Sequence, residues 1–192
     1  MFAKLSDSIT RSLAENGKVK TEDLALCQYG VKQLLTILLN LMTALAIGCL
    51  FGMVWESILF HAAYIPLRSY AGGFHAKTPL RCYLYSILMI IVVLMVLRYA
   101  PEQNIYDGVA YLISGVIFWK LAPVEDHNKP LDEIEKKVFR KRTIFVWCLE
   151  SAVIILFFFL HWQRAGRCIV LSMLVLSCML IAGKIKNVRY QC

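Results

Sequence analysis

The sequence lacks most of the short motifs that identify soluble enzymes and metal sites. None of its 192 residues forms a phosphate-binding GxxxxGK[ST], a dinucleotide-binding GxGxxG or a metalloprotease HExxH. Its seven cysteines include no CxxC pair, which argues against a zinc site and against a thioredoxin-like site. Internal repeats and Gly/Ser-rich linkers are also absent. We therefore expect one domain over residues 1–192, with no metal and no cofactor.

Apolar residues are what the sequence has in abundance. Hydrophobic residues make up 59% of the chain and the mean hydropathy is +0.60, too apolar for an ordinary soluble domain. The pattern predicts an all-α polytopic membrane protein with about six segments: Val31–Phe51, Met53–Leu67, Leu80–Leu97, Ile105–Leu121, Thr143–His161 and Cys168–Ala182. The second and fourth segments are shorter than the roughly 20 residues of a full membrane span.

The first twenty residues lack the uninterrupted apolar core of a secretory signal peptide. Their apolar residues Phe2, Leu5, Ile9 and Leu13 instead recur at helical spacing, with charged residues between them. This pattern predicts an amphipathic helix that lies in the membrane interface. A short solvated helix packed on the rest of the protein is the alternative.

Lysine and arginine are distributed unequally between the two sides of the six segments. Of the 21 basic residues, 18 fall on the side that holds both termini, the 68–81 loop and the 120–142 loop. The opposite side holds Arg98, Arg164 and Arg167. The positive-inside rule therefore predicts that both termini and the 68–81 loop are cytoplasmic. The net charge of +8 needs no nucleic acid, because anionic lipid headgroups or an acidic peptide explain it.

One polar stretch, RSYAGGFHAKTPLRC at residues 68–82, separates the second and third apolar segments. Gly72-Gly73 can adopt backbone angles closed to other residues, so we expect the helix to break there. Thr78-Pro79 has the residue types of a helix start, a threonine cap followed by proline. Cys82 would then lie at the end of the first helical turn. There the helix dipole and Arg81 favour the thiolate that a cysteine nucleophile needs.

His75 and Cys82 are the candidate catalytic pair. A straight helix would separate them by about 10 Å along its axis, but a turn can fold the imidazole back toward the thiol. Such a pair suits acyl transfer. Spacing alone is no evidence, because His161 and Cys168 are also seven apart, without the double glycine or the Thr-Pro start. The alternative is a loop histidine bound to backbone and an ordinary thiol.

The run R-x3-G-G-x-H-x6-C, formed by Arg68, Gly72, Gly73, His75 and Cys82, resembles the signature of the accessory gene regulator B (AgrB) family. Residues 122–131, APVEDHNKPL, resemble a second segment of many members of these bacterial quorum-sensing membrane peptidases. The resemblance covers nearly the whole chain. It implies that the matched cysteine is the nucleophile and the matched histidine the base in cleaving the C-terminal part from a small AgrD-type propeptide. The product would close to a thiolactone or lactone, and the enzyme would be a homodimer.

Other residues are candidates for binding the substrate. Arg68 and the amides of Gly72 and Gly73 either hold an oxyanion or substrate carbonyl or shape the loop. The resemblance implies that the propeptide has an acidic C-terminal tail, which a basic cluster on the same side can hold. Positive-inside anchoring explains the same charges equally well. The cluster comprises Lys136, Lys137, Arg140, Lys141 and Arg142.

The third catalytic group, which would orient His75, has four candidates in the sequence: Glu56, Asp126, Asn128 and Ser86. Two functions of other classes remain open. One is a small transporter in which His61, Glu56 and His75 line a polar path, although no inverted repeat is evident. The other is a membrane scaffold whose basic loop docks a partner.

Reporter fusions test the charge-based topology. A reporter fused after Lys141 should report the cytoplasm, because that loop carries seven of the basic residues. A matched fusion after Arg164 should report the outside. An external signal from the Lys141 fusion would overturn the predicted orientation.

Overall fold

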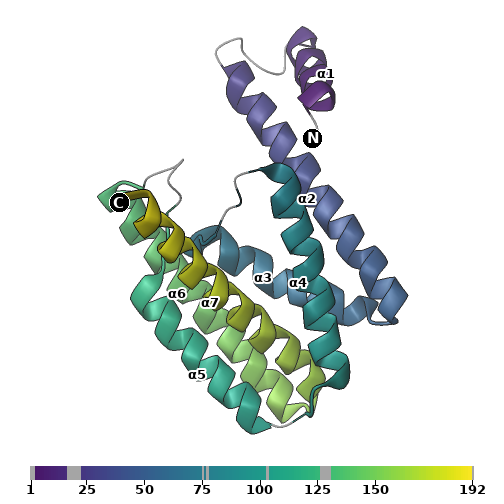
Figure 1. The fold of residues 1–192 in the computed structure, drawn as a ribbon, viewed down its shortest axis with the longest axis vertical. Coiled ribbons are helices and arrows are strands. Elements are labelled where there is room, and N and C mark those ends of the chain that lie inside the picture. The colour runs from purple at the N-terminus through teal and green to yellow at the C-terminus, as the bar shows by residue number, and fades with distance from the viewer. Residues whose placement is uncertain are drawn as a thin grey trace.

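The computed structural model of the chain is helical almost throughout (Figure 1). It describes residues 3–16, 23–74, 76, 78–102, 104–125 and 131–191, and for 189–191 the backbone alone. These residues contain one isolated β-bridge and no longer strand. The predicted all-α fold is confirmed. The described helices are α1 Ala3–Glu15, α2 Leu24–Phe51, α3 Val54–Ala71, α4 Pro79–Tyr99, α5 Asn104–Leu121, α6 Glu133–Phe159 and α7 Gln163–Gln191.

Each of the helices α2 to α7 covers most of one of the six apolar segments. Among the described residues, α2, α4, α6 and α7 are long and apolar enough to cross a membrane. These four helices make the chain a multi-pass membrane protein. The helices α3 and α5 have 18 residues each and carry charged residues near both ends. A total of six spans therefore stays a prediction.

Helix α3 connects two groups of helices, α2 with α4 and α5 with α6 and α7 (Figure 1). One core cluster surrounds Leu67, Phe118 and Met173, from α3, α5 and α7. The other surrounds Phe60 and Leu94, from α3 and α4, and also includes residues of α2 and α7. Because α3 contributes to both clusters, it holds the two groups together, and its C-terminal end packs in the first cluster.

Helix α1 packs on the start of α2, and Gln28 donates a hydrogen bond to Asp7 across this contact. Ser6 and Thr10 are buried, whereas Leu5 of the apolar stripe is exposed. The N-terminal segment is therefore a helix. Its place in the membrane interface stays a prediction.

The three arginines of the sparsely charged side lie at one end of the bundle. Arg98 donates to the last carbonyl of α2 at 3.3 Å. Arg164 pairs with Glu56 of α3 at 2.8 Å, and Arg167 pairs with Asp107 of α5 at 3.5 Å. The basic residues that the sequence assigns to the sparsely charged side therefore lie together at one end of the folded bundle.

Candidate active site

The polar stretch begins where α3 ends, at a turn that only glycine accommodates easily. Gly72 has φ +74° and Gly73 has φ +122°, values that side chains disfavour. A Cβ atom added to Gly72 would also collide with the carbonyl oxygen of Val124. The helix break that the sequence predicts is therefore present, and it brings the chain against the 122–125 segment.

Val124 joins the two segments on which the family resemblance rests. Its amide donates to the carbonyl of Ala71 at 2.9 Å, and its carbonyl accepts from the amide of Gly73 at 3.3 Å. The next residue, Glu125, accepts a hydrogen bond from Asn187 of α7 on its carbonyl, at 2.7 Å. Two stretches about fifty residues apart in sequence thus form one unit at the end of the bundle.

Arg68 holds the same turn with its side chain. Its Nη1 donates to the Gly72 carbonyl at 3.1 Å and its Nη2 to the Phe74 carbonyl at 2.5 Å. The amides of Gly72 and Gly73 donate to carbonyls of Arg68 and Val124. Because these donors are used within the protein, the oxyanion role considered for Arg68 and the two glycines is not supported. The alternative, that they shape the loop, fits the arrangement.

Helix α7 supports the turn from the other side. The amide of Phe74 donates to the carbonyl of Met179 at 2.9 Å. A Cβ atom on Gly183 would lie 2.8 Å from the carbonyl carbon of Gly73 and 2.9 Å from the nitrogen of Phe74. No local feature of the sequence indicates this contact, because Gly183 lies inside a helix more than a hundred residues further along the chain.

Cys82 lies at the end of the first turn of α4, as predicted from the Thr78-Pro79 start. Thr78 caps the helix, because its Oγ1 accepts from the amide of Arg81 at 3.3 Å, and Pro79 is the first helical residue. Cys82 is half-buried and not in a disulfide. Ser86, one turn further, donates its hydroxyl to the Cys82 carbonyl at 3.1 Å.

Tyr64 is a residue that the sequence-based reasoning missed. Its phenol lies within electrostatic range of both the Arg68 guanidinium and the Cys82 thiol. Tyr64 and Arg68 are four apart in α3 and therefore share a face of the helix. That spacing was visible in the sequence, but its relation to Cys82 depends on how α3 meets α4.

Glu56 is not near this site. It is paired with Arg164 at 2.8 Å and precedes Arg68 by twelve residues of α3, or about 18 Å along the helix. This pairing gives no support to the suggestion that Glu56 orients His75, and agrees with the alternative that Glu56 pairs with an arginine. Three of the predicted residues lie outside the described residues, namely His75, Asp126 and Asn128.

The basic residues of the cluster on α6 fall into two groups, those with partners in the protein and those without a described partner. Lys136 forms ion pairs with two carboxylates, at 3.4 and 3.8 Å. Arg140 donates to the Trp119 carbonyl at 3.1 Å and lies over the Trp119 ring. Arg142 lies over the ring of Tyr70, near the end of α3. These three cations hold neighbouring elements of the protein together.

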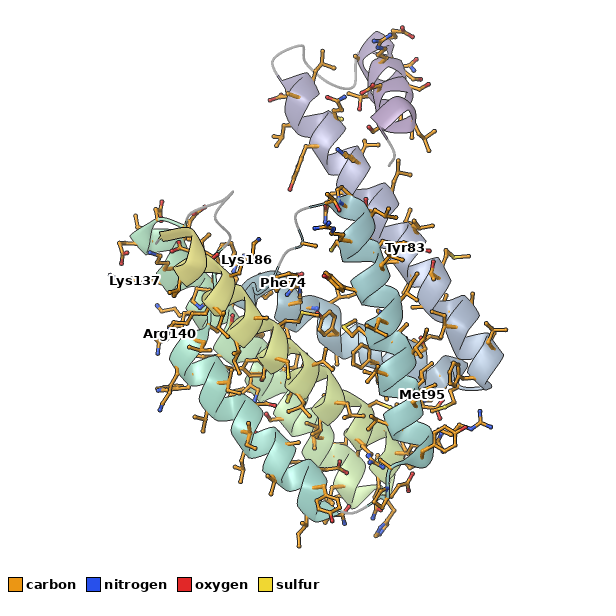
Figure 2. All side chains as sticks on the ribbon, viewed as in Figure 1. Phe74, Tyr83, Met95, Lys137, Arg140 and Lys186 are labelled. Carbon is orange, nitrogen blue, oxygen red and sulfur yellow. The ribbon has the colours of Figure 1, made fainter. Side chains whose placement is uncertain are left out.

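Lys137 and Lys141 differ from the other members of the cluster. Within the described residues, neither side chain has an ion-pair or hydrogen-bond partner. Figure 2 shows Lys137 and Arg140 on the outer side of the bundle, at the same end as Phe74 and Lys186. These two lysines are the members best placed to bind an external anion.

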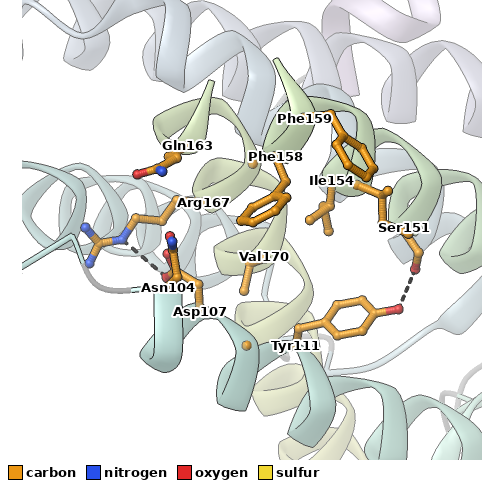
Figure 3. A pocket seen from close by; sticks show the side chains of 13 residues that line it. Asn104, Asp107, Tyr111, Ser151, Ile154, Phe158, Phe159, Gln163, Arg167 and Val170 are labelled. Atoms are coloured by element: carbon orange, nitrogen blue, oxygen red, sulfur yellow. Dashed lines mark hydrogen bonds and ion pairs between the residues drawn. The ribbon is translucent and has the colours of Figure 1, made fainter. Parts of the chain in front are cut away.

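A cavity at the other end of the bundle is lined by none of the predicted site residues (Figure 3). It has a volume of about 360 Å³ and lies between α5, α6 and α7. The Arg167–Asp107 ion pair lies at one side, and Tyr111 donates to Ser151 at 2.8 Å on the other. It is separate from the Cys82 site.

Comparisons with known proteins match most of the chain, including the two segments on which the family resemblance rests. The profile described as Accessory gene regulator B matches residues 6–181. An AgrB-like protein of Clostridium perfringens is 27% identical over 176 residues, covering 85% of this chain and 82% of that protein. An AgrB-like protein of Halalkalibacterium halodurans is 25% identical over 190 residues, covering 98% and 91%.

Protein FsrB of Enterococcus faecalis is 30% identical over 114 residues, which cover 58% of this chain and 47% of FsrB. No solved structure matches this chain. Since the profile covers most of its length, the chain belongs to the AgrB family and to accessory gene regulator quorum sensing.

Replacing Gly183 with alanine tests the contact between α7 and the turn. The new Cβ would meet backbone atoms that cannot rotate away, so we expect a loss of about 1–3 kcal/mol of stability. Gly108→Ala is the matched control, because its Cβ would meet nothing within 4 Å and alanine favours a helix. Melting temperatures in detergent measure both. Equal stability of the two variants would contradict the contact.

Proposed function

We propose that this chain is a membrane-embedded cysteine endopeptidase that removes the C-terminal part of a small AgrD-type propeptide. The observation that carries the proposal is the position of Cys82. It lies half-buried in the first turn of α4, after a capped Thr78-Pro79 start. Tyr64 of α3, one turn before the Arg68 that fixes the Gly72-Gly73 turn, lies within electrostatic range of it. A thiol in the first turn of a helix has surroundings that suit a nucleophile.

The first step is acyl transfer to Cys82. His75 takes the proton from the thiol, and the sulfur attacks the carbonyl carbon of the cleaved peptide bond. The C–N bond breaks, and the imidazolium gives its proton to the departing amine. The N-terminal part of the propeptide is then held as a thioester on Cys82, while the C-terminal part leaves.

The second step returns the enzyme to its starting state. A thiol or hydroxyl of the bound peptide gives its proton to His75 and attacks the thioester carbonyl. The C–S bond to Cys82 breaks, the Cys82 sulfur takes the proton back from His75, and a thiolactone or lactone ring closes. Exchange of one thioester for another is nearly balanced in energy, so water must be kept from the intermediate. Most residues of α4 after Cys82 are apolar, which favours a site with little water.

The proposal includes six membrane-crossing helices with both termini in the cytoplasm. At 18 residues, α3 and α5 are each about 27 Å long, close to the roughly 30 Å of a bilayer core. Arg98, Arg164 and Arg167 gather at one end, away from Arg68 and Arg140. The candidate site then faces the cytoplasm. The proposal also includes a homodimer, which only the family resemblance supports.

A transporter fits the structure less well. Glu56 is bound to Arg164, and the Nδ1 of His61 is within 2.9 Å of the Ser57 carbonyl in its own helix. These contacts leave no polar path through the described part of α3. A scaffold without activity is distinguished from a peptidase by the cleavage assay below.

The propeptide's acidic tail is proposed to bind Lys137 and Lys141. These are the α6 cations that the described contacts leave available, whereas Lys136, Arg140 and Arg142 hold neighbouring elements. From the Cys82 site, a tail would reach them across the end of α7.

Co-expression with the propeptide tests the nucleophile. Cys82→Ala and His75→Ala should abolish cleavage, because each removes a group that takes part in bond breaking. Cys168→Ala should cleave normally, since that thiol is buried in the core and distant from the turn. Gel analysis of the propeptide measures all three. Unaltered cleavage by Cys82→Ala would sink the proposal.

A double variant tests the tail site. Lys137→Ala with Lys141→Ala should raise KM about 3- to 10-fold and leave kcat unchanged, because the lysines bind tail and transition state alike. The effect should shrink at high salt and disappear for a propeptide with a neutral tail. An equal effect on acidic and neutral tails would contradict the assignment.

A further inference from the structure

An apolar cavity of about 370 Å³ lies between α4 and α7. Tyr85, Met89 and Val92 line it from α4, Val175 and Met179 from α7, and Phe74 from the turn. Nearly all of its lining is apolar, and it is separate from the cavity at the other end of the bundle. We call it the α4–α7 groove.

The groove begins next to Cys82. Cys82, Tyr85 and Met89 follow at helical spacings of three and four, so they form one stripe along α4. Tyr83 points another way, toward α2, where it shares a 2.8 Å hydrogen bond with Thr43. The side of α4 that carries Cys82 is therefore the side that faces α7 and the groove.

Phe74 forms the end of the groove nearest Cys82. Its ring lies 6.0 Å from the ring of Tyr85, and the Lys186 ammonium lies 5.5 Å from its centre. Figure 2 shows Phe74 and Lys186 together in the space between the two helices. The turn that carries the family signature thus also builds the wall of an apolar cavity, with a cation at its mouth.

We propose that the α4–α7 groove binds apolar side chains of the propeptide on the acyl side of the cleaved bond. This inference rests on the proposed peptidase function. The acyl part stays attached to Cys82, so its next side chains must lie within a few ångströms of this groove. The acidic tail cannot enter it, because an apolar wall does not compensate a buried carboxylate. The groove would therefore select the substrate and hold the thioester for ring closure.

Two half-exposed valines supply a matched test. Val92 lines the α4–α7 groove and is 49% exposed, while Val116 lines an apolar cavity between α5 and α6 and is 54% exposed. Val92→Trp fills the groove, and Val116→Trp adds the same bulk elsewhere on the apolar surface. Both are assayed with the parent propeptide and with propeptides whose apolar acyl-side residues are changed singly to alanine.

Wild-type enzyme should lose about tenfold in kcat/KM when a side chain that fills the groove becomes alanine. Val92→Trp should lose about tenfold on the parent propeptide and should no longer distinguish it from the alanine peptide. Val116→Trp should match wild type on both. If Val92→Trp also matches wild type, the groove proposal is overturned while the peptidase proposal stands. If wild type forms no product at all, both are overturned.

A crosslinking experiment tests the groove proposal if Val92→Trp does not fold. A benzophenone amino acid is placed at position 92 or 116 in Cys82→Ala enzyme, which binds propeptide without cleaving it. Position 92 should crosslink to the propeptide and position 116 should not. Crosslinks from position 92 to lipid alone, or to a second copy of the chain, would overturn the proposal.

Discussion

The close approach of the Gly72-Gly73 turn to α7 and to the 122–125 segment is the contact on which the candidate site depends. The positive φ angles and the missing Cβ atoms of Gly72 and Gly183 let three stretches of backbone meet. Hydrogen bonds then connect the turn to Val124 and Met179, and Arg68 binds two of its carbonyls. If the backbones could not approach, the turn that presents the Gly72 and Phe74 carbonyls to Arg68 would lose its support.

The two ends of the bundle differ in how their charged residues are used. At one end lie the turn, Cys82 and the α6 cations. At the other, Arg164 and Arg167 pair with carboxylates of α3 and α5, so those charges are neutralised within the protein. The proposed peptidase needs Cys82 at a polar end of the bundle and an apolar groove further along the same helix, because its peptide must be both recognised and shielded from water.

The sequence predicted the features that depend on neighbouring residues. The helix break at Gly72-Gly73 and the Thr78-Pro79 start follow from backbone preferences within a few positions, and both are present. The Val124 bridge, the Gly183 contact and the position of Tyr64 could not be predicted, because each joins elements distant in the chain. The partner of Glu56 could not be predicted for the same reason, because Arg164 lies over a hundred residues away.

Intact-mass spectrometry of the enzyme after brief mixing with its propeptide tests the central claim most directly. The account predicts a covalent adduct on Cys82 with the mass of the propeptide's N-terminal part, formed as the C-terminal part is released. Hydroxylamine should remove the adduct, because it cleaves thioesters. Release of the C-terminal part without any adduct, or with the adduct on another cysteine, would contradict the account.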